Sequence, residues 1–134
     1  MTDETYLKMI LALPDEFFDG WEWQAGDKAL SINDQYKREL LLLTTDPIKK
    51  LNSNDNVKLL FSHSVDGVTV EEYIFNLRPV PSQQQLQKLS GLDWDVYYHD
   101  LVKNYSEYDS DEQAGLAMIT YMKYGKIWDG EHWV

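Results

Sequence analysis

The sequence of 134 residues predicts an α+β fold, with a sheet in the middle of the chain and helices at both ends. Apolar residues recur at helical spacing near the N-terminus and again from Trp94 onward. Between these segments, β-branched runs are separated by turn-forming residues. We therefore expect a central antiparallel sheet of about four strands, an N-terminal helix, two to three C-terminal helices and a short C-terminal hairpin.

Residues 2–13 are predicted to form the first helix. Its apolar residues, spaced three or four positions apart, are Tyr6, Leu7, Ile10 and Leu11. Thr2 is a candidate cap at the start, and Pro14 marks the end.

Turn and strand signals fill the middle of the chain. Trp21 and Trp23 are two residues apart, which predicts that they lie on the same side of a strand that begins the sheet. Further candidate strands are residues 28–32, 39–45, 57–62 and 68–77. Asp66-Gly67 lies between two β-branched runs and is a strong hairpin signal. The Asn-rich residues 52–56 are expected to break regular structure and form a long loop.

Helical signals return after Pro79 and Pro81. Ser82 with Gln85 forms a capping box for a helix through residue 89, and Ser110 with Gln113 forms a second box for a helix that ends at Gly125. Between them, one helix of about four turns is predicted to carry an aromatic stripe: Trp94, Tyr97, Tyr98, Leu101, Val102, Tyr105 and Tyr108. Residues 126–134 are predicted to form a miniature hairpin around Asp129-Gly130. No linker interrupts the chain, so we predict a single domain over residues 1–134.

Several classes of chemistry find no support in the sequence. The chain has no cysteine, which excludes disulfides and thiolate metal sites. Its histidines, His63, His99 and His132, are far apart and form no close ligand pattern, and no phosphate-binding loop or serine nucleophile elbow is present. We therefore predict no catalytic residue, no cofactor and no metal. No apolar run approaches about 18 residues, so we expect no membrane association. We expect a cytoplasmic protein.

The charge balance is strongly acidic. Twelve basic and 23 acidic side chains give a formal net charge of −11, concentrated in residues 1–27 and 93–134. Such a surface disfavours direct binding to nucleic acid. An acidic surface helps to keep a protein in solution. It also allows a more specific hypothesis, in which the carboxylates imitate a phosphate backbone and occupy the basic groove of a protein partner. The candidate partner-binding residues are Asp93, Asp95, Asp100, Glu107, Asp109, Asp111 and Glu112.

Two segments resemble small proteins of phages and prophages of Gram-positive bacteria. Residues 79–87, PVPSQQQLQ, resemble a proline-then-QxQLQ segment of those proteins, and residues 126–134, KIWDGEHWV, are similar to their WDGExW tail. The resemblance implies the setting of a phage accessory gene in a host cell, and it carries no catalytic residue.

The sequence thus predicts a non-enzymatic, acidic, phage-type accessory protein that binds a protein partner. In the sharper version it inhibits a nucleic-acid-processing host enzyme through a DNA-mimic-like surface. Two alternatives stay open: a small carboxylate- or metal-dependent hydrolase, and a self-assembling structural protein. The aromatic stripe is expected to be mostly core. Its exposed part, together with Trp128 and Trp133, is a candidate anchor for a partner or for a second copy in a homo-oligomer.

Overall fold

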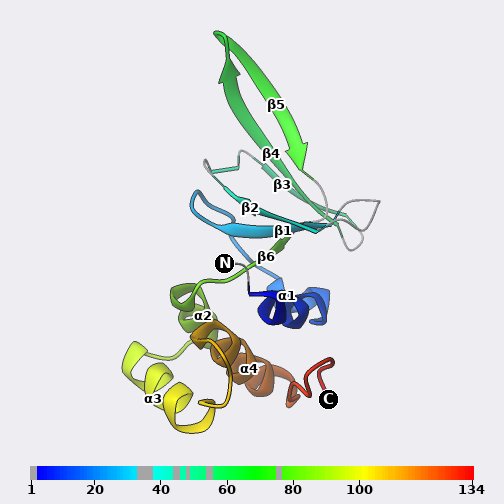
Figure 1. The fold of residues 1–134 in the computed structure, drawn as a ribbon. Coiled ribbons are helices and arrows are strands. Elements are labelled where there is room, and N and C mark those ends of the chain that lie inside the picture. Colours follow the sequence, from blue (N-terminus) through cyan, green and yellow to red (C-terminus); the bar gives the residue numbers. More distant parts are fainter. Residues whose placement is uncertain (1–2, 33–37, 44–45, 48, 54–55, 75–76) are drawn as a thin grey trace. The chain divides into compact units, whose positions relative to one another are not determined.

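The computed structural model describes residues 3–32, 38–43, 46–47, 49–53, 56–74 and 77–134. It confirms the α+β class, with a helix first, antiparallel strands next and three helices last (Figure 1). The chain divides into two compact units. The helical unit comprises Met1–Leu13 and Pro81–Val134, and the sheet unit comprises Pro14–Val80. That the two units form a single domain stays a prediction.

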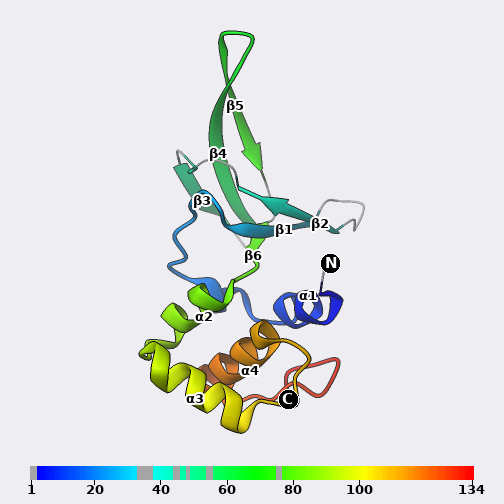
Figure 2. The ribbon, with the colours of Figure 1, turned by 60° about the vertical axis from the view of Figure 1, so that its left-hand side comes forward.

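The sheet unit begins with a short 3-10 helix, η1 (Asp15–Phe18), and continues in strands. The strands are β1 (Lys28–Ile32), β2 (Arg38–Leu42), β3 (Lys49–Ser53), β4 (Asn56–Val65), β5 (Val68–Ile74) and β6 (Leu77–Pro79). Within the described residues they pair antiparallel in two three-stranded sheets, ordered β2-β1-β6 and β3-β4-β5 (Figure 2).

The predicted hairpin at Asp66-Gly67 is confirmed. Val65 lies opposite Val68, so β4 and β5 are joined by a two-residue turn. Both turn residues have a positive φ, 51° at Asp66 and 80° at Gly67, as a type I′ turn requires.

The prediction of a long loop at residues 52–56 is wrong. Asn52 and Ser53 belong to β3, Asn56 belongs to β4, and Ser53 lies opposite Asn56. Pairing along the whole length of β3 overrides the low strand propensity of asparagine, because the ladder is formed by backbone groups. Asn54 and Asp55 lie outside the described residues.

The prediction of a strand at Trp21 and Trp23 is also wrong, because the first strand begins at Lys28. The two indole rings meet edge to face, with centroids 6.3 Å apart. Trp23 is buried with Ala29, Leu43 and Leu77, and Trp21 packs against this cluster. The tryptophans therefore fill the core of the sheet unit from an irregular segment.

The helical unit contains α1 (Glu4–Leu11), α2 (Gln83–Ser90), α3 (Trp94–Asn104) and α4 (Asp111–Tyr124). Helix α4 contacts the other three, and Figures 1 and 2 show it between α1 and α3. All residues from Gln113 to Thr120 are buried, as expected for a helix with neighbours on several sides. The core of this unit therefore surrounds α4.

The ends of these helices follow the predicted signals closely. The capping box of Ser82 and Gln85 is complete, and Gly91 and Gly125 end α2 and α4 in the left-handed conformation. The N-cap of α1 is Asp3, whose carboxylate accepts from the Tyr6 backbone N–H. The proposed cap Thr2 lies outside the described residues.

The C-terminal segment forms the predicted miniature hairpin. Trp128 and Trp133 are joined by a single β-bridge, and the backbones of Ile127 and Val134 exchange two hydrogen bonds. Trp133 also donates its indole N–H to the backbone oxygen of Met9, at 3.0 Å. This hydrogen bond therefore connects the hairpin to the C-terminal part of α1 within the helical unit.

Candidate functional site

The outer face of α3 exposes large apolar side chains. Trp94 and Tyr98 are each 46% exposed, and Val102 is 53% exposed. The rings of Trp94 and Tyr98 stack, with centroids 5.8 Å apart and planes 20° apart. Because residues i, i+4 and i+8 lie on one side of a helix, the three side chains form a continuous surface. We call Trp94, Tyr98 and Val102 the α3 stripe.

The predicted aromatic stripe is therefore divided between inside and outside. Tyr97 and Leu101 are buried, and the Tyr97 hydroxyl donates to the Gln83 side-chain oxygen of α2 at 3.2 Å. Helix α3 ends at Asn104, so Tyr105 and Tyr108 follow the helix instead of continuing it. The prediction of four turns on one stripe is wrong, because the spacing alone does not reveal where the backbone leaves the helix.

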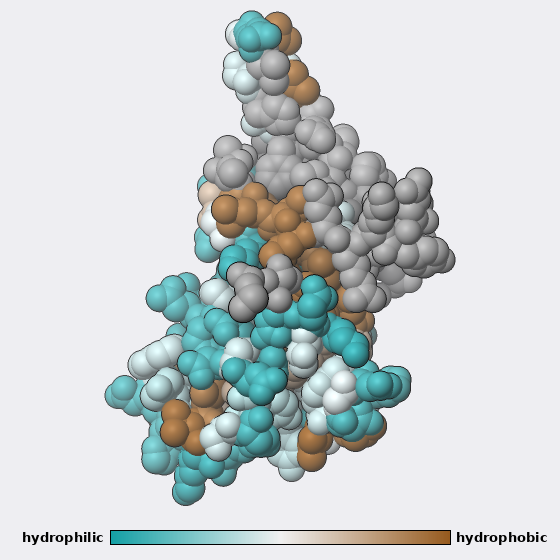
Figure 3. Space-filling model, in the orientation of Figure 1, coloured by the Kyte–Doolittle hydropathy of each residue, from teal (hydrophilic) through white to brown (hydrophobic). Residues whose placement is uncertain are grey.

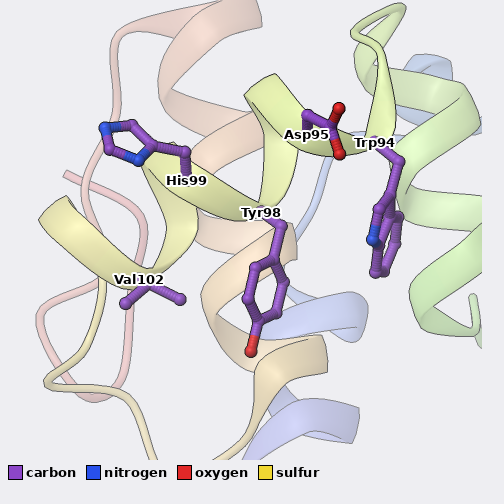
Figure 4. Close-up of a pocket in the computed structure, with 5 residues that line it drawn as sticks. All are labelled: Trp94, Asp95, Tyr98, His99 and Val102. Atoms are coloured by element: carbon purple, nitrogen blue, oxygen red, sulfur yellow. The ribbon is translucent and has the colours of Figure 1, made fainter.

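The α3 stripe borders a shallow depression of about 290 Å³. Asp95 and His99 line it together with the three stripe residues. Trp94 and Tyr98 project from the same side of the helix, and His99 points away from them (Figure 4). Figure 3 shows hydrophobic atoms over α3 surrounded by more hydrophilic ones. An apolar strip with a polar border is the usual anatomy of a protein-binding surface.

The structure places all seven predicted partner-binding carboxylates in the helical unit. Asp93, Asp95, Glu107, Asp109 and Asp111 are exposed, and Asp100 and Glu112 are half-buried. Asp93 occupies the N-cap position of α3 but makes no side-chain capping bond, so its carboxylate is available to solvent. The exposed carboxylates are thus accessible from solvent.

The carboxylates do not all gather at one point. Asp100 and Glu107 lie close enough to Tyr105 to raise the pKa of its phenol, behind the larger effect of burial. Asp111 and Glu112 act in the same way on Tyr97, again after burial. Both of these residues are in the first turn of α4, where the helix dipole favours negative charge. Asp111 and Glu112 therefore have a structural role at the helix start.

A second depression, of about 250 Å³, lies where three segments of the helical unit meet. Its lining residues are Asn104, Tyr105, Glu107, Tyr108, Ala117, Tyr121, Lys126 and Ile127. The helical spacing predicted Tyr105 and Tyr108 to lie on one helical stripe, and no sequence pattern indicated a role for Tyr121. Only the close approach of the α3–α4 connection, α4 and the C-terminal segment makes this pocket visible.

Asp3 has a role in joining two helices that the sequence pattern did not predict. Besides capping α1, its carboxylate accepts hydrogen bonds from the Ser110 hydroxyl at 3.0 Å and from the Gln113 side-chain amide. Ser110 caps α4 as predicted, but the Gln113 side chain reaches Asp3. Asp3 thus joins the starts of two helices, and it shapes the helical unit rather than a binding surface.

Neither a metal centre nor a membrane-spanning helix is found in the part of the chain that the structure describes. No three His, Asp or Glu residues there are grouped so that they could hold a metal ion. No helix there combines the length and the apolar character needed to cross a bilayer. The chain matches no family model, no curated protein and no solved structure.

Proposed function

We propose that this chain is a non-enzymatic, phage-type accessory protein that acts in the host cytoplasm by binding a protein partner through the α3 stripe. The observation that carries the proposal is the exposure of a stacked Trp94–Tyr98 pair on a helix whose other face is buried. Exposing two large aromatic rings to water is unfavourable, and a partner that covers them recovers that free energy. Tryptophan and tyrosine are also the residues that most often dominate binding energy at interfaces.

The charge around the α3 stripe favours a basic partner. The helical unit has eleven acidic and five basic side chains, which gives a formal net charge of −6. Asp93 and Asp95 are at the start of α3, and Asp100 is on the same helix. A surface of this sign attracts a basic groove and speeds association with it. A nucleic-acid-processing enzyme of the host has such a groove, and the resemblance of residues 79–87 and 126–134 to phage proteins supports the same setting.

The proposal is tested by capture of partners from a Gram-positive host lysate at low and at high salt. The wild-type protein is expected to retain a nucleic-acid-binding enzyme at low salt and to release it at high salt, because screening weakens the charge attraction. The double substitution Trp94→Ala/Tyr98→Ala is expected to abolish retention. Met122→Ala is the matched control, since Met122 is a similarly exposed apolar residue on α4.

Two results would contradict the proposal. One is retention of the same enzyme by the Trp94→Ala/Tyr98→Ala protein. The other is a concentration-dependent dimer of the protein alone, measured by sedimentation, that the same substitutions dissociate. The second result would assign the α3 stripe to a second copy of the chain, as in a self-assembling structural protein.

A further inference from the structure

Three tyrosines line the 250 Å³ pocket of the helical unit, which we call the tyrosine pocket. Tyr105 and Tyr108 belong to the segment between α3 and α4, and Tyr121 belongs to α4. The rings of Tyr105 and Tyr108 stack with centroids 6.4 Å apart and planes 29° apart. Both residues are half-buried, and Tyr121 is 52% exposed. Aromatic rings in this pocket are therefore accessible from solvent.

The electrostatics of the tyrosine pocket favour a positive ligand. The face of an aromatic ring is negative, and a cation within about 6 Å of the ring centre is attracted to it. Glu107 lines the pocket and adds a full negative charge. Burial first, and then charge effects that include the carboxylates of Asp100 and Glu107, raise the pKa of the Tyr105 phenol. These two carboxylates therefore place a negative field at this ring.

We propose that the tyrosine pocket binds the guanidinium group of an arginine side chain on the protein partner. A planar guanidinium stacks on an aromatic ring and donates hydrogen bonds to a carboxylate at the same time. The pocket offers both kinds of contact, through its tyrosine rings and Glu107. The identity of the ligand as part of a partner rests on the proposed function, whereas binding of the guanidinium group itself is tested independently of any partner.

Lys126 lines the same pocket, so substituting it tests whether the ligand is a cation. Its ammonium group repels an incoming cation. Replacing it by methionine keeps a long apolar side chain and removes the charge. Binding of an arginine ligand is therefore expected to become stronger in Lys126→Met.

The experiment is an NMR titration of the full chain with the peptide acetyl-Gly-Gly-Arg-Gly-Gly-amide. The ring signals of Tyr105, Tyr108 and Tyr121 are expected to shift on binding. The matched peptide contains citrulline, which has nearly the shape of arginine but no charge, and it is expected to bind about 10-fold more weakly. Equal binding of the two peptides would overturn the proposal.

Variants separate the contribution of the rings from that of the charge. Tyr121→Leu is expected to weaken arginine binding about 3-fold, and Tyr121→Phe, which keeps the ring, is expected to retain it. Glu107→Gln is expected to weaken binding while the fold is unchanged, because Glu107 is exposed. A Tyr121→Leu protein that binds as well as wild type, or stronger binding by Glu107→Gln, would contradict the assignment of the site.

Failure of this proposal and failure of the proposed function give different results. Trp94→Ala/Tyr98→Ala leaves the tyrosine pocket intact, so it is expected to bind the arginine peptide normally while losing the partner. Partner capture through the α3 stripe without any peptide binding would overturn the arginine site alone. Specific peptide binding without any captured partner would leave the arginine site standing and overturn the proposed function.

Discussion

Gly115 determines how closely three helices approach one another in the helical unit. A methyl group at this position of α4 would overlap the Tyr97 hydroxyl oxygen of α3 and would lie 3.1 Å from a methyl carbon of Leu86 in α2. The Tyr97 ring is fully buried, and its hydroxyl is bonded to Gln83. The ring therefore cannot move aside without losing a hydrogen bond and opening a cavity.

Gly115→Ala is expected to lower the free energy of unfolding by about 1–3 kcal/mol, measured by urea denaturation with tryptophan fluorescence. Alanine favours the helix by about 1 kcal/mol, so the steric effect has to exceed this gain. In a double-mutant cycle, Tyr97→Phe removes the overlapping oxygen and is expected to recover part of the loss. A Gly115→Ala protein as stable as wild type would show that the three helices are not held this closely.

At the scale of whole helices, one carboxylate joins two of them. Asp3 caps α1 and receives hydrogen bonds from Ser110 and Gln113 at the start of α4. Burial alone would raise the pKa of Asp3, but hydrogen bonds from the Tyr6 backbone and from the Gln113 and Ser110 side chains outweigh it, and the pKa is lowered. The ionised form is therefore favoured in the folded state.

Asp3→Ala is expected to reduce the free energy of unfolding by about 1–2 kcal/mol near pH 7. Because the folded pKa lies below the unfolded value, the wild-type advantage is complete above the unfolded pKa, about 3.9, and is lost as the pH falls through the folded pKa. Urea denaturation of both proteins from neutral to acidic pH measures this. Glu4→Ala, an exposed acidic residue in the same turn, is the control. If the difference in free energy of unfolding between wild type and Asp3→Ala became larger toward low pH, this role of Asp3 would be contradicted.

At the scale of the whole molecule, the dominant property is the net charge of −11. The helical unit has a formal net charge of −6, and the sheet unit, with twelve acidic and seven basic side chains, has −5. Both units are thus acidic. Repulsion among like charges opposes the compact state, and salt reduces it because the screening length is about 10 Å at 0.1 M.

The melting temperature is therefore expected to rise between low salt and about 0.2 M KCl, measured by differential scanning calorimetry. The triple variant Asp93→Asn/Asp95→Asn/Glu107→Gln removes three exposed charges. Its melting temperature is expected to rise less than that of the wild type over the same range of salt. A melting temperature that falls over this range would show that attractive charge pairs outweigh the repulsion.

Signals contained within a few residues were readable from the sequence. The capping box at Ser82, the left-handed Gly125 and the turn at Asp66-Gly67 are all where they were predicted. Each depends on backbone conformation within a single turn, which the local residues determine. The α+β class follows from the same kind of signal, because helical and strand spacing are local patterns.

Long-range contacts decided the rest. The inward position of Tyr97 depends on Gly115 and Gln83, and the role of Asp3 depends on Ser110, more than a hundred positions away. Contacts between distant residues also divide the strands between two sheets. They likewise bring three segments together at the tyrosine pocket. The sequence by itself determined the class of the fold, most of its helices and strands, the caps at Ser82 and Ser110, and the acidic character. Only the tertiary structure decided which side chains are exposed together, because packing depends on the sum of many weak contacts between distant residues.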